Sequence, residues 1–262
     1  MISFSANLGF LWTDQPLPDA IRSAAAAGFD AVECHMPYMH AHGDVASALL
    51  ETGLTMTSIN TRFGDHEGEL GIAAVPGEEA RAQNAIDEAI EYAAAIGCAN
   101  VSVLAGRTGR GPQSEQTYRR NLTHAATSAA PLGIGVLIEP LNTRFVPDYH
   151  LTTISQGLET IDAIGQDNVK LMVDCLHTYL MEGDLYPRFE LAMPYVGHVQ
   201  ISAYPDRGEP IGGEIDYHTP LPALIELGYT GLFGAEYTPR GDIDAGLDWL
   251  ASWHTRREGS SS

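Results

Sequence analysis

The sequence predicts a (β/α)8 barrel, a closed ring of eight parallel strands surrounded by helices. Short apolar runs alternate with Ala-rich amphipathic stretches from end to end, and the runs number eight. The length of 262 residues is the size expected of eight strand–helix pairs. A doubly wound open sheet is the alternative layout, but no Gly-rich phosphate loop follows the first strand, so we favour the barrel.

Most of the predicted strands are continuous runs of Val, Ile, Leu and Phe, which is typical of strands buried on both faces. In chain order they are Ile2–Leu8, Ala31–Cys34, Thr55–Ile59, Val101–Leu104, Gly135–Ile138, Val169–Val173, Val196–Ile201 and Leu232–Ala235. The predicted helices show an apolar stripe at helical spacing, and most are followed by a glycine stop. They are Pro18–Ala27, Glu78–Ile96, Ser155–Ile164, Asp184–Met193 and Pro220–Leu227. No long linker interrupts the chain, so we expect one domain over residues 1–258 and a flexible tail over 259–262.

The charge of the chain excludes several classes of protein. Lys plus Arg total 14 against 34 for Asp plus Glu, a net charge of −20, which would repel a nucleic-acid backbone or an acidic membrane surface. A small anionic substrate remains compatible with this charge, because one cation can invert the field within a pocket. No stretch approaches the length of a membrane helix. Three scattered cysteines, no C-x-x-C motif and no secretory signal predict a cytoplasmic protein.

Oxygen-bearing side chains stand at the ends of the last four predicted strands. Function in this fold collects at the carboxyl ends of the strands. The side chains are those of Glu139, Asp174, Gln200 and Glu236. Three converging carboxylates repel one another and need a compensating cation, and an all-oxygen set suits Mg2+ or Mn2+ better than zinc. Alternatively, each acid caps a neighbouring helix or pairs with a loop arginine.

The chain resembles the hydroxypyruvate isomerase family over nearly its whole length, with no large insertion. The resemblance rests on an ordered set of short stretches rather than on one specific motif. These are Ala6–Leu8, Gly28–Glu33, Leu137–Thr143, Asp174–His177, Met181–Leu185, Gly197–Ile201, Arg207–Pro210, Gly213–Tyr217 and Gly234–Tyr237.

That family belongs to the xylose isomerase-like TIM barrels, and the resemblance implies interconversion of hydroxypyruvate and 2-hydroxy-3-oxopropanoate (tartronate semialdehyde). It implies that Glu139 and Glu236 are the acid/base pair, and that both hold a divalent metal together with Asp174 and Gln200. Moving a carbonyl to the adjacent carbon requires removal of one proton, an enediolate intermediate and return of a proton. Carboxylates on strands five and eight, across the barrel mouth, suit that task.

Three further residues are candidates for binding the substrate. The resemblance places His177 after strand six as a donor to a substrate oxygen. Arg207, in the loop after strand seven, is the first candidate for binding the substrate carboxylate, and Arg62, after strand three, is the second. His198 either orients Gln200, with which it shares a face, or is an ordinary interior histidine. The chain departs from the family at Cys34–Met36, where more apolar residues are usual, and this departure weakens the assignment of the substrate.

Other activities remain as alternatives. A 2-oxo-tetronate isomerase is the main rival, since one extra hydroxymethyl group changes little in such a site. Ketohexose epimerases tend to have a histidine where Gln200 stands and an extra acid near Phe145. Abasic-site endonucleases need more histidine ligands and a basic groove. A sugar-acid binding protein is the non-enzyme alternative, and a homo-oligomer is compatible with the family although no motif specifies it.

Overall fold

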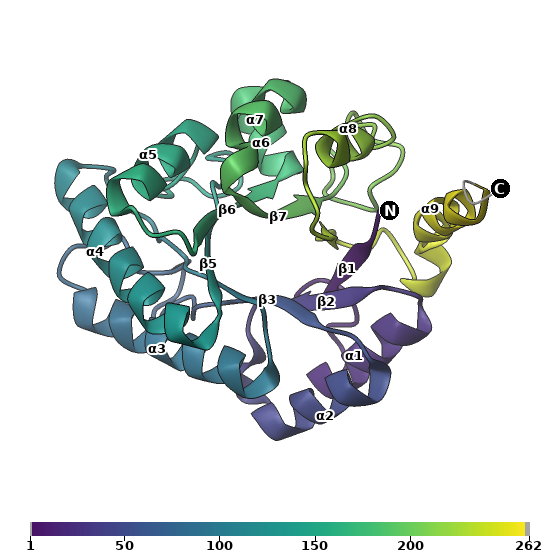
Figure 1. Cartoon of the computed structure of the whole chain (residues 1–262), viewed down its shortest axis with the longest axis horizontal. Helices are drawn as coiled ribbons and strands as arrows, with labels where there is room; N and C mark the ends of the chain where they lie inside the picture. The colour runs from purple at the N-terminus through teal and green to yellow at the C-terminus, as the bar shows by residue number, and fades with distance from the viewer. Residues whose placement is uncertain (1, 260–262) are drawn as a thin grey trace.

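The computed structural model of the chain describes residues 2–259 and contains a closed barrel of eight parallel strands. Each strand pairs with the next in the sequence, and β8 pairs with β1 to close the ring, which Figure 1 shows from one end. The strands are β1 (Phe4–Asn7), β2 (Ala31–Cys34), β3 (Met56–Asn60), β4 (Asn100–Ser102), β5 (Gly135–Ile138), β6 (Val169–Asp174), β7 (Val196–Ile201) and β8 (Phe233–Ala235). The predicted fold class and strand order are confirmed.

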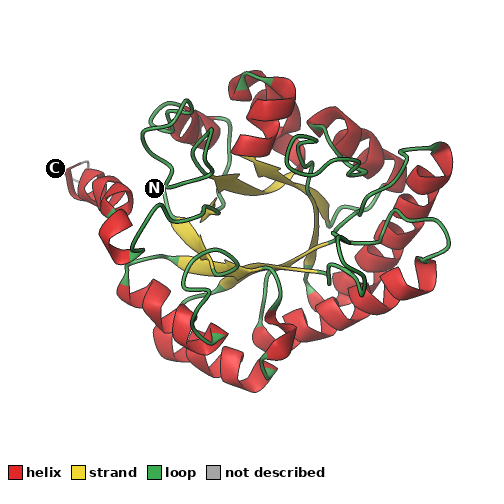
Figure 2. Ribbon diagram, turned by 180° about the vertical axis from the view of Figure 1, so that it is seen from behind, coloured by secondary structure: helices red, strands yellow, loops and turns green. Residues whose placement is uncertain are grey.

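The helices form a layer around the barrel, and Figure 2 shows them on the outside of the strands when seen from behind. They are α1 (Leu17–Ala26), α2 (His42–Thr52), α3 (Glu79–Ile96), α4 (Pro112–Ala129), α5 (Ile154–Ile164), α6 (Cys175–Glu182), α7 (Leu185–Ala192), α8 (Pro220–Glu226) and α9 (Asp248–Gly259). The predicted tail overlaps α9 at Gly259 and otherwise lies outside the described residues.

The five predicted helices are confirmed to within a residue or two of each end, and α3 stops at Gly97 in the left-handed conformation as expected. Four further helices were not predicted. In α4 the buried face is formed partly by small polar residues such as Thr117 and Asn121, so it lacks the apolar stripe that predicts a helix. Helix α6 begins directly after β6, so no loop residues mark its start in the sequence.

The barrel interior near β1, β2, β7 and β8 is polar. Side chains alternate along a strand, so residues two apart share a face. The carboxylate of Glu33 on β2 reaches His198 and Gln200 on β7. Apolar side chains on the other face, such as Phe4 of β1, pack against α9 through Trp249. The alternation therefore places polar groups in the interior and apolar groups under the helices.

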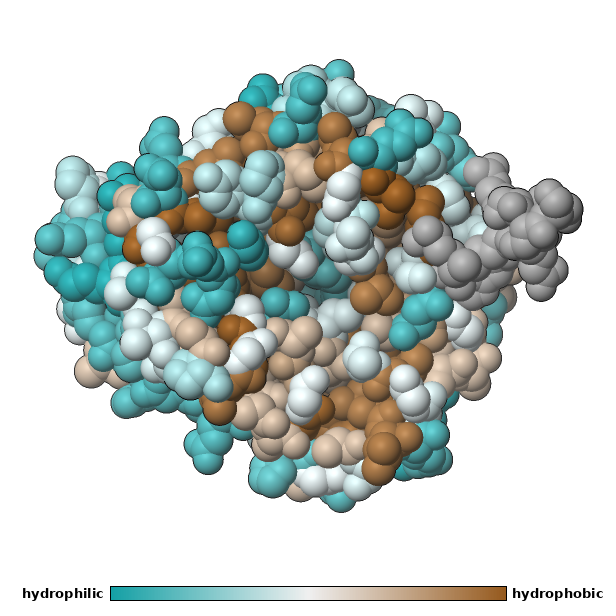
Figure 3. All heavy atoms as spheres, in the orientation of Figure 1, coloured by the Kyte–Doolittle hydropathy of each residue, from teal (hydrophilic) through white to brown (hydrophobic). Residues whose placement is uncertain are grey.

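The outer surface carries mixed polar and apolar residues. In Figure 3 hydrophilic residues dominate the side that α3 and α4 cover, at the left of the view. Among residues 2–259, none of the helices combines the length and apolar character that crossing a bilayer requires.

Candidate active site

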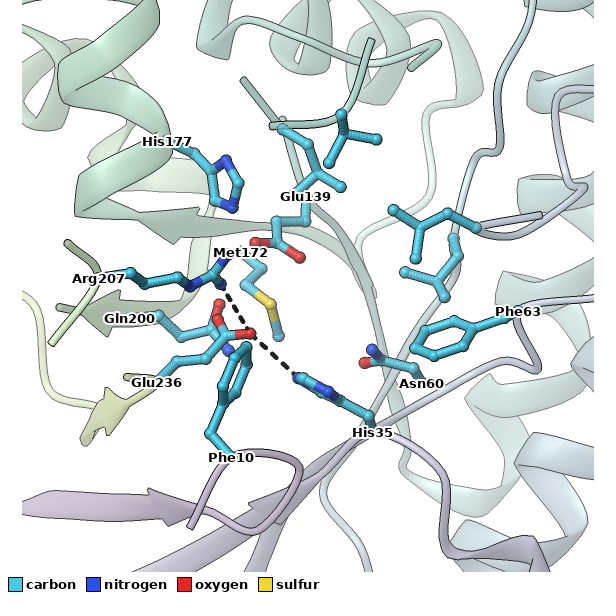
Figure 4. Close-up of a pocket in the computed structure, with 14 residues that line it drawn as sticks. Phe10, His35, Asn60, Phe63, Glu139, Met172, His177, Gln200, Arg207 and Glu236 are labelled. Carbon is cyan, nitrogen blue, oxygen red and sulfur yellow. Dashed lines mark hydrogen bonds and ion pairs between the residues drawn. The ribbon is translucent and has the colours of Figure 1, made fainter. Parts of the chain in front are cut away.

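A cavity of about 210 Å³ lies at the carboxyl ends of the strands (Figure 4). This is smaller than the roughly 300–1,000 Å³ of pockets that enclose drug-sized ligands, so it suits a molecule of a few heavy atoms. Acidic, basic and amide side chains meet aromatic ones in its wall. The lining residues include Phe10, His35, Asn60, Phe63, Glu139, Met172, His177, Gln200, Arg207 and Glu236.

The structure brings the four predicted oxygen donors to this one end of the barrel. Glu139 follows β5, Asp174 ends β6, Gln200 lies on β7 and Glu236 follows β8. Ligand atoms of Glu139, Asp174 and His177 lie within 4.8 Å of one another. Asp174 also caps α6, because its Oδ1 accepts the backbone N–H of Leu176 at 2.6 Å. Both stated alternatives are therefore found at Asp174: its Oδ1 caps a helix, and its Oδ2 lies 3.6 Å from a guanidinium nitrogen of Arg207.

Three buried oxygens of this set have no hydrogen-bond partner among the described residues. They are Oδ2 of Asp174, Oε1 of Gln200 and Oε2 of Glu236. A buried polar atom without a partner is costly, so such atoms in one place point to a missing ligand. Carboxylate and amide oxygens are the donors that hard divalent cations prefer. The donor set therefore fits a cation such as Mg2+ or Mn2+.

Arg207 supplies positive charge at this point. A terminal nitrogen of its guanidinium lies 3.1 Å from Oε1 of Glu236 and 3.6 Å from Oδ2 of Asp174. Its guanidinium carbon also stands 4.9 Å from the ring centroid of Phe10. The neighbouring acids Asp206 and Glu209 do not compete for it, because both bind Arg240 instead. Arg207 faces the cavity (Figure 4), as a group that binds an anionic substrate should.

The carboxyl groups of the site differ in their electrostatic environments. Burial and the negative charges of Glu236 and Asp174 raise the pKa of Glu139 well above its usual range. Burial also raises the pKa of Asp174 to about 7, against the opposing charge of Arg207. For Glu236, burial is outweighed by Arg207 and by a hydrogen bond with His35, which lower its pKa to about 2. The site thus holds one strongly ionised carboxylate opposite a carboxyl group that favours its proton.

His177 presents a neutral ring to the site. The sequence prediction placed it in a loop, whereas it lies in the first turn of α6. Its Nδ1 accepts the backbone N–H of Asn142 at 2.9 Å, so the ring proton is on Nε2, the nitrogen nearer Asp174. Burial, followed by the positive charge of Arg207, lowers the pKa of His177 to about 3. His177 can therefore donate a hydrogen bond without adding charge.

Two predicted site residues do not line the cavity: Asp174 lies behind its wall, next to Glu139 and His177, whereas Arg62 lies away from it altogether. Two of its nitrogens donate to the carboxylate of Glu88 on α3, at 2.5 and 2.7 Å. Its guanidinium lies over the ring of Tyr38, with 4.5 Å between the guanidinium carbon and the ring centroid. The side chain is thus held at the outer surface, where it lines a separate groove.

His35 was not among the predicted site residues, yet it lines the cavity. It stands just beyond β2, and its Nε2 lies 3.1 Å from Oε1 of Glu236, which is 201 positions away in the sequence. A Cβ on Gly9 would lie 2.4 Å from Nδ1 of His35, so the glycine makes room for the ring. Two features of the sequence could have indicated His35. It lies two residues after Glu33, on the same face of the strand, and it belongs to the stretch where the chain departs from the family pattern.

Comparison with known proteins assigns the family. A sequence model of the xylose isomerase-like TIM barrel matches residues 21–253. The chain belongs to this family. It is 39% identical to the 2-oxo-tetronate isomerase of Cupriavidus necator, over 95% of this chain and 98% of the relative. It is 37% identical to the hydroxypyruvate isomerase of Escherichia coli K12, with the same coverage. The predicted resemblance to the hydroxypyruvate isomerase family is confirmed, and the chain is an isomerase.

Solved structures support the same fold. A protein of Brucella melitensis described as an AP endonuclease of family 2 superposes with a TM-score of 0.93 at 36% identity, over 97% of this chain and 99% of the other. The D-allulose 3-epimerase of a Methylomonas species superposes with a TM-score of 0.77 at 21% identity, over 96% and 90% of the two chains. At that identity the likeness concerns the fold alone.

Proposed function

We propose that this enzyme interconverts hydroxypyruvate and 2-hydroxy-3-oxopropanoate. The observation that carries the proposal is the pair of buried carboxyl groups, Glu139 and Glu236, that face one small cavity from β5 and β8. Binding a sugar acid does not need two opposed groups of this kind, whereas moving a proton between adjacent carbons does. The identity of the chain to an isomerase of hydroxypyruvate supports this substrate.

The reaction moves hydrogen within one molecule and consumes nothing else. One carboxylate takes a proton from the hydroxymethyl carbon of hydroxypyruvate, and the electron pair of the broken C–H bond forms the enediolate. A proton is then returned to the adjacent carbon, while the hydroxyl proton passes between the two oxygens. Glu139 and Glu236 can hold and return the carbon-bound proton, and the Nε2–H of His177 can donate to a substrate oxygen.

Glu139, Asp174, Gln200 and Glu236 would hold a divalent metal, Mg2+ or Mn2+. Such an ion supplies Lewis-acid stabilisation of the negative charge that develops on the substrate oxygens. The three unpartnered oxygens described above support this assignment. The planar fork of Arg207 suits the substrate carboxylate, because its guanidinium already lies among acidic groups and faces the cavity.

A 2-oxo-tetronate is the second candidate substrate. The identity to an isomerase of that class, 39%, is slightly higher than the 37% to the hydroxypyruvate isomerase of Escherichia coli. His35 and Asn60 add polar groups to the cavity wall, which a fourth carbon with its hydroxyl could use. The chemistry is the same for both substrates, so the two candidates differ only in the length of the acid.

A turnover assay on three-carbon and four-carbon oxo-hydroxy acids tests the proposal. Each acid is assayed with the native enzyme, after treatment with a chelator, and after Mg2+ or Mn2+ is restored. We expect turnover of hydroxypyruvate, its loss on chelation and its return with the metal. Turnover of the four-carbon acids alone would replace the first candidate by the second. Turnover that the chelator leaves unchanged would contradict the metal assignment.

Glu139→Gln and Glu236→Gln test the catalytic pair. Each substitution keeps the size of the side chain and removes its ability to accept a proton, so turnover should fall by about 10²–10⁴-fold with an unchanged circular dichroism spectrum. A sugar-acid binding protein would have no turnover to lose. Unchanged turnover in the double variant would refute the mechanism.

We further propose that the enzyme works in the cytoplasm. All three cysteines, Cys34, Cys98 and Cys175, are buried and unpaired, as is usual for proteins of reducing compartments.

A further inference from the structure

A buried carboxylate that the proposed mechanism does not use lies deeper in the barrel. Glu33, on β2, is 1% exposed and accepts four hydrogen bonds. Its Oε2 lies 2.5 Å from Nε2 of His198 and 3.1 Å from Oγ of Ser5. Its Oε1 accepts the amide groups of Asn7 and Gln200, each at 2.8 Å. Burying a charged carboxylate is costly even when hydrogen bonds compensate for it, so its presence calls for a role beyond packing.

The side chain of Glu33 crosses the barrel interior, and a glycine on β8 makes room for it. Glu33 is on β2 and Gln200 is on β7, and β1 and β8 lie between them in the ring. At the crossing point β8 carries Gly234, where a Cβ would stand 2.5 Å from Oε2 of Glu33 and 2.8 Å from Nε2 of His198. The glycine leaves the space that the carboxylate and the imidazole fill.

The contact with Glu33 decides which way the amide of Gln200 faces. An ionised carboxylate only accepts hydrogen bonds, so Gln200 must turn its NH2 group toward Glu33. The amide oxygen then faces the opposite way, and it is the buried Oε1 that has no partner among residues 2–259.

We propose that Glu33 is a positioning residue, which fixes the amide of Gln200 with its oxygen toward the cation site. The inference rests on the proposed function, because that function makes Gln200 a metal ligand. Glu33 does not line the cavity, and it acts through Gln200. The same carboxylate also holds Asn7, whose amide lies 3.2 Å from Nε2 of His35, so it supports the side of the cavity where Glu236 stands.

The test compares Glu33→Met with Glu33→Gln, and the readout is the affinity for Mn2+ measured by calorimetry. Methionine has nearly the same size and accepts no strong hydrogen bond, so the Kd should rise by about 10–100-fold, the usual effect of losing a partner that orients a ligand. In Glu33→Gln the new carbonyl oxygen can still accept from Asn7 and Gln200, while the new NH2 group can donate to Oγ of Ser5 and to Nε2 of His198, once the proton of that neutral ring is on Nδ1. Its Kd should stay within about threefold of the native value.

Glu115→Met is the matched control. Glu115 on α4 also joins a histidine and a hydroxyl, at 3.0 Å from His150 and 3.0 Å from Thr160, but it lies outside the barrel. Its loss should lower the melting temperature without changing the Kd for Mn2+. An equal Kd in Glu33→Met and the native enzyme would overturn the inference. An equal loss in both Glu33 variants would do so as well, because it would trace the effect to charge and not to the accepting oxygen.

A second measurement applies to the native, metal-free enzyme and does not depend on a variant that folds. The side-chain NH2 signals of Gln200 are assigned in ¹⁵N-labelled protein by their loss in Gln200→Met, and the proton that is donated to Glu33 should exchange slowly with solvent. Fast exchange would overturn the inference by itself. Slow exchange in an enzyme that neither binds Mn2+ nor isomerises hydroxypyruvate would support the hydrogen bond while refuting the proposed function.

Discussion

Replacing Arg207 by methionine should make the stability of this enzyme depend on a divalent cation. The guanidinium is the counter-charge of Glu236, at 3.1 Å, and of Asp174, at 3.6 Å, and these two carboxylates are 7% and 0% exposed. Methionine fills much of the same space, and it leaves Asp174 without its counter-charge and Glu236 with only its contact to His35. Removing one partner of a buried ion pair costs about 3–5 kcal/mol. In a chain of this length that loss lowers the melting temperature by about 10 °C.

The assay is thermal unfolding with EDTA and with Mn2+ in excess, at about pH 8, where Asp174 of the native enzyme, with its pKa of about 7, is mainly ionised. Loss of Arg207 raises that pKa further, and a bound cation opposes the rise. Mn2+ should restore most of the loss in Arg207→Met, because the ion takes over as counter-charge, and should raise the melting temperature of the native enzyme less. Arg240→Met is the control, since its ion pairs with Asp206 and Glu209 lie at the rim. Equal Mn2+ shifts in all three proteins would refute the reasoning.

Three other changes have defined outcomes. Gly234→Ala should lower the free energy of unfolding in urea by about 1–3 kcal/mol, because the new Cβ would stand 2.5 Å from Glu33. An unchanged value would show that the interior has spare room. His35→Phe removes a hydrogen bond to Glu236, so kcat should fall by about 10–100-fold. Full activity would show that His35 does not contribute to catalysis. Hydrogen bonds lower the pKa of Glu115 from 4.5 to about 2, so its ionised form stabilises the fold above about pH 4.5. The free energy of unfolding of the native enzyme should exceed that of Glu115→Gln by about 3 kcal/mol at pH 7 and by about half of that at pH 3. A constant difference would contradict the assigned shift.

The strand ends could be predicted from the sequence because the fold has a strong local signature. Most of the buried strands contain a short apolar run, and parallel topology brings every carboxyl end to the same face. Glu139, Asp174 and Glu236 follow such runs directly. Their meeting place followed from the fold class alone, without any knowledge of side-chain directions.

Side chains whose partners lie far away in the sequence could not be predicted in this way. Glu33 is one acid in a four-residue strand, and the residues that explain it, His198 and Gln200, are 165 and 167 positions further on. Arg62 has the right charge in the right kind of loop, but Glu88 on α3 turns it outward. A loop sequence states which charges are present, and the packing of the neighbouring helices decides where they point.

The ring is closed by the pairing of its first and last strands, and the bond between His35 and Glu236 crosses that seam. A chain emerging from the ribosome therefore has no finished cavity until nearly all of its residues have been made. Contacts between distant parts of a chain form late, because bringing them together costs the most loop entropy. Recovery of turnover after dilution from urea should therefore report the joining of the two ends, and a fragment that stops before β8 should remain inert however well its helices form.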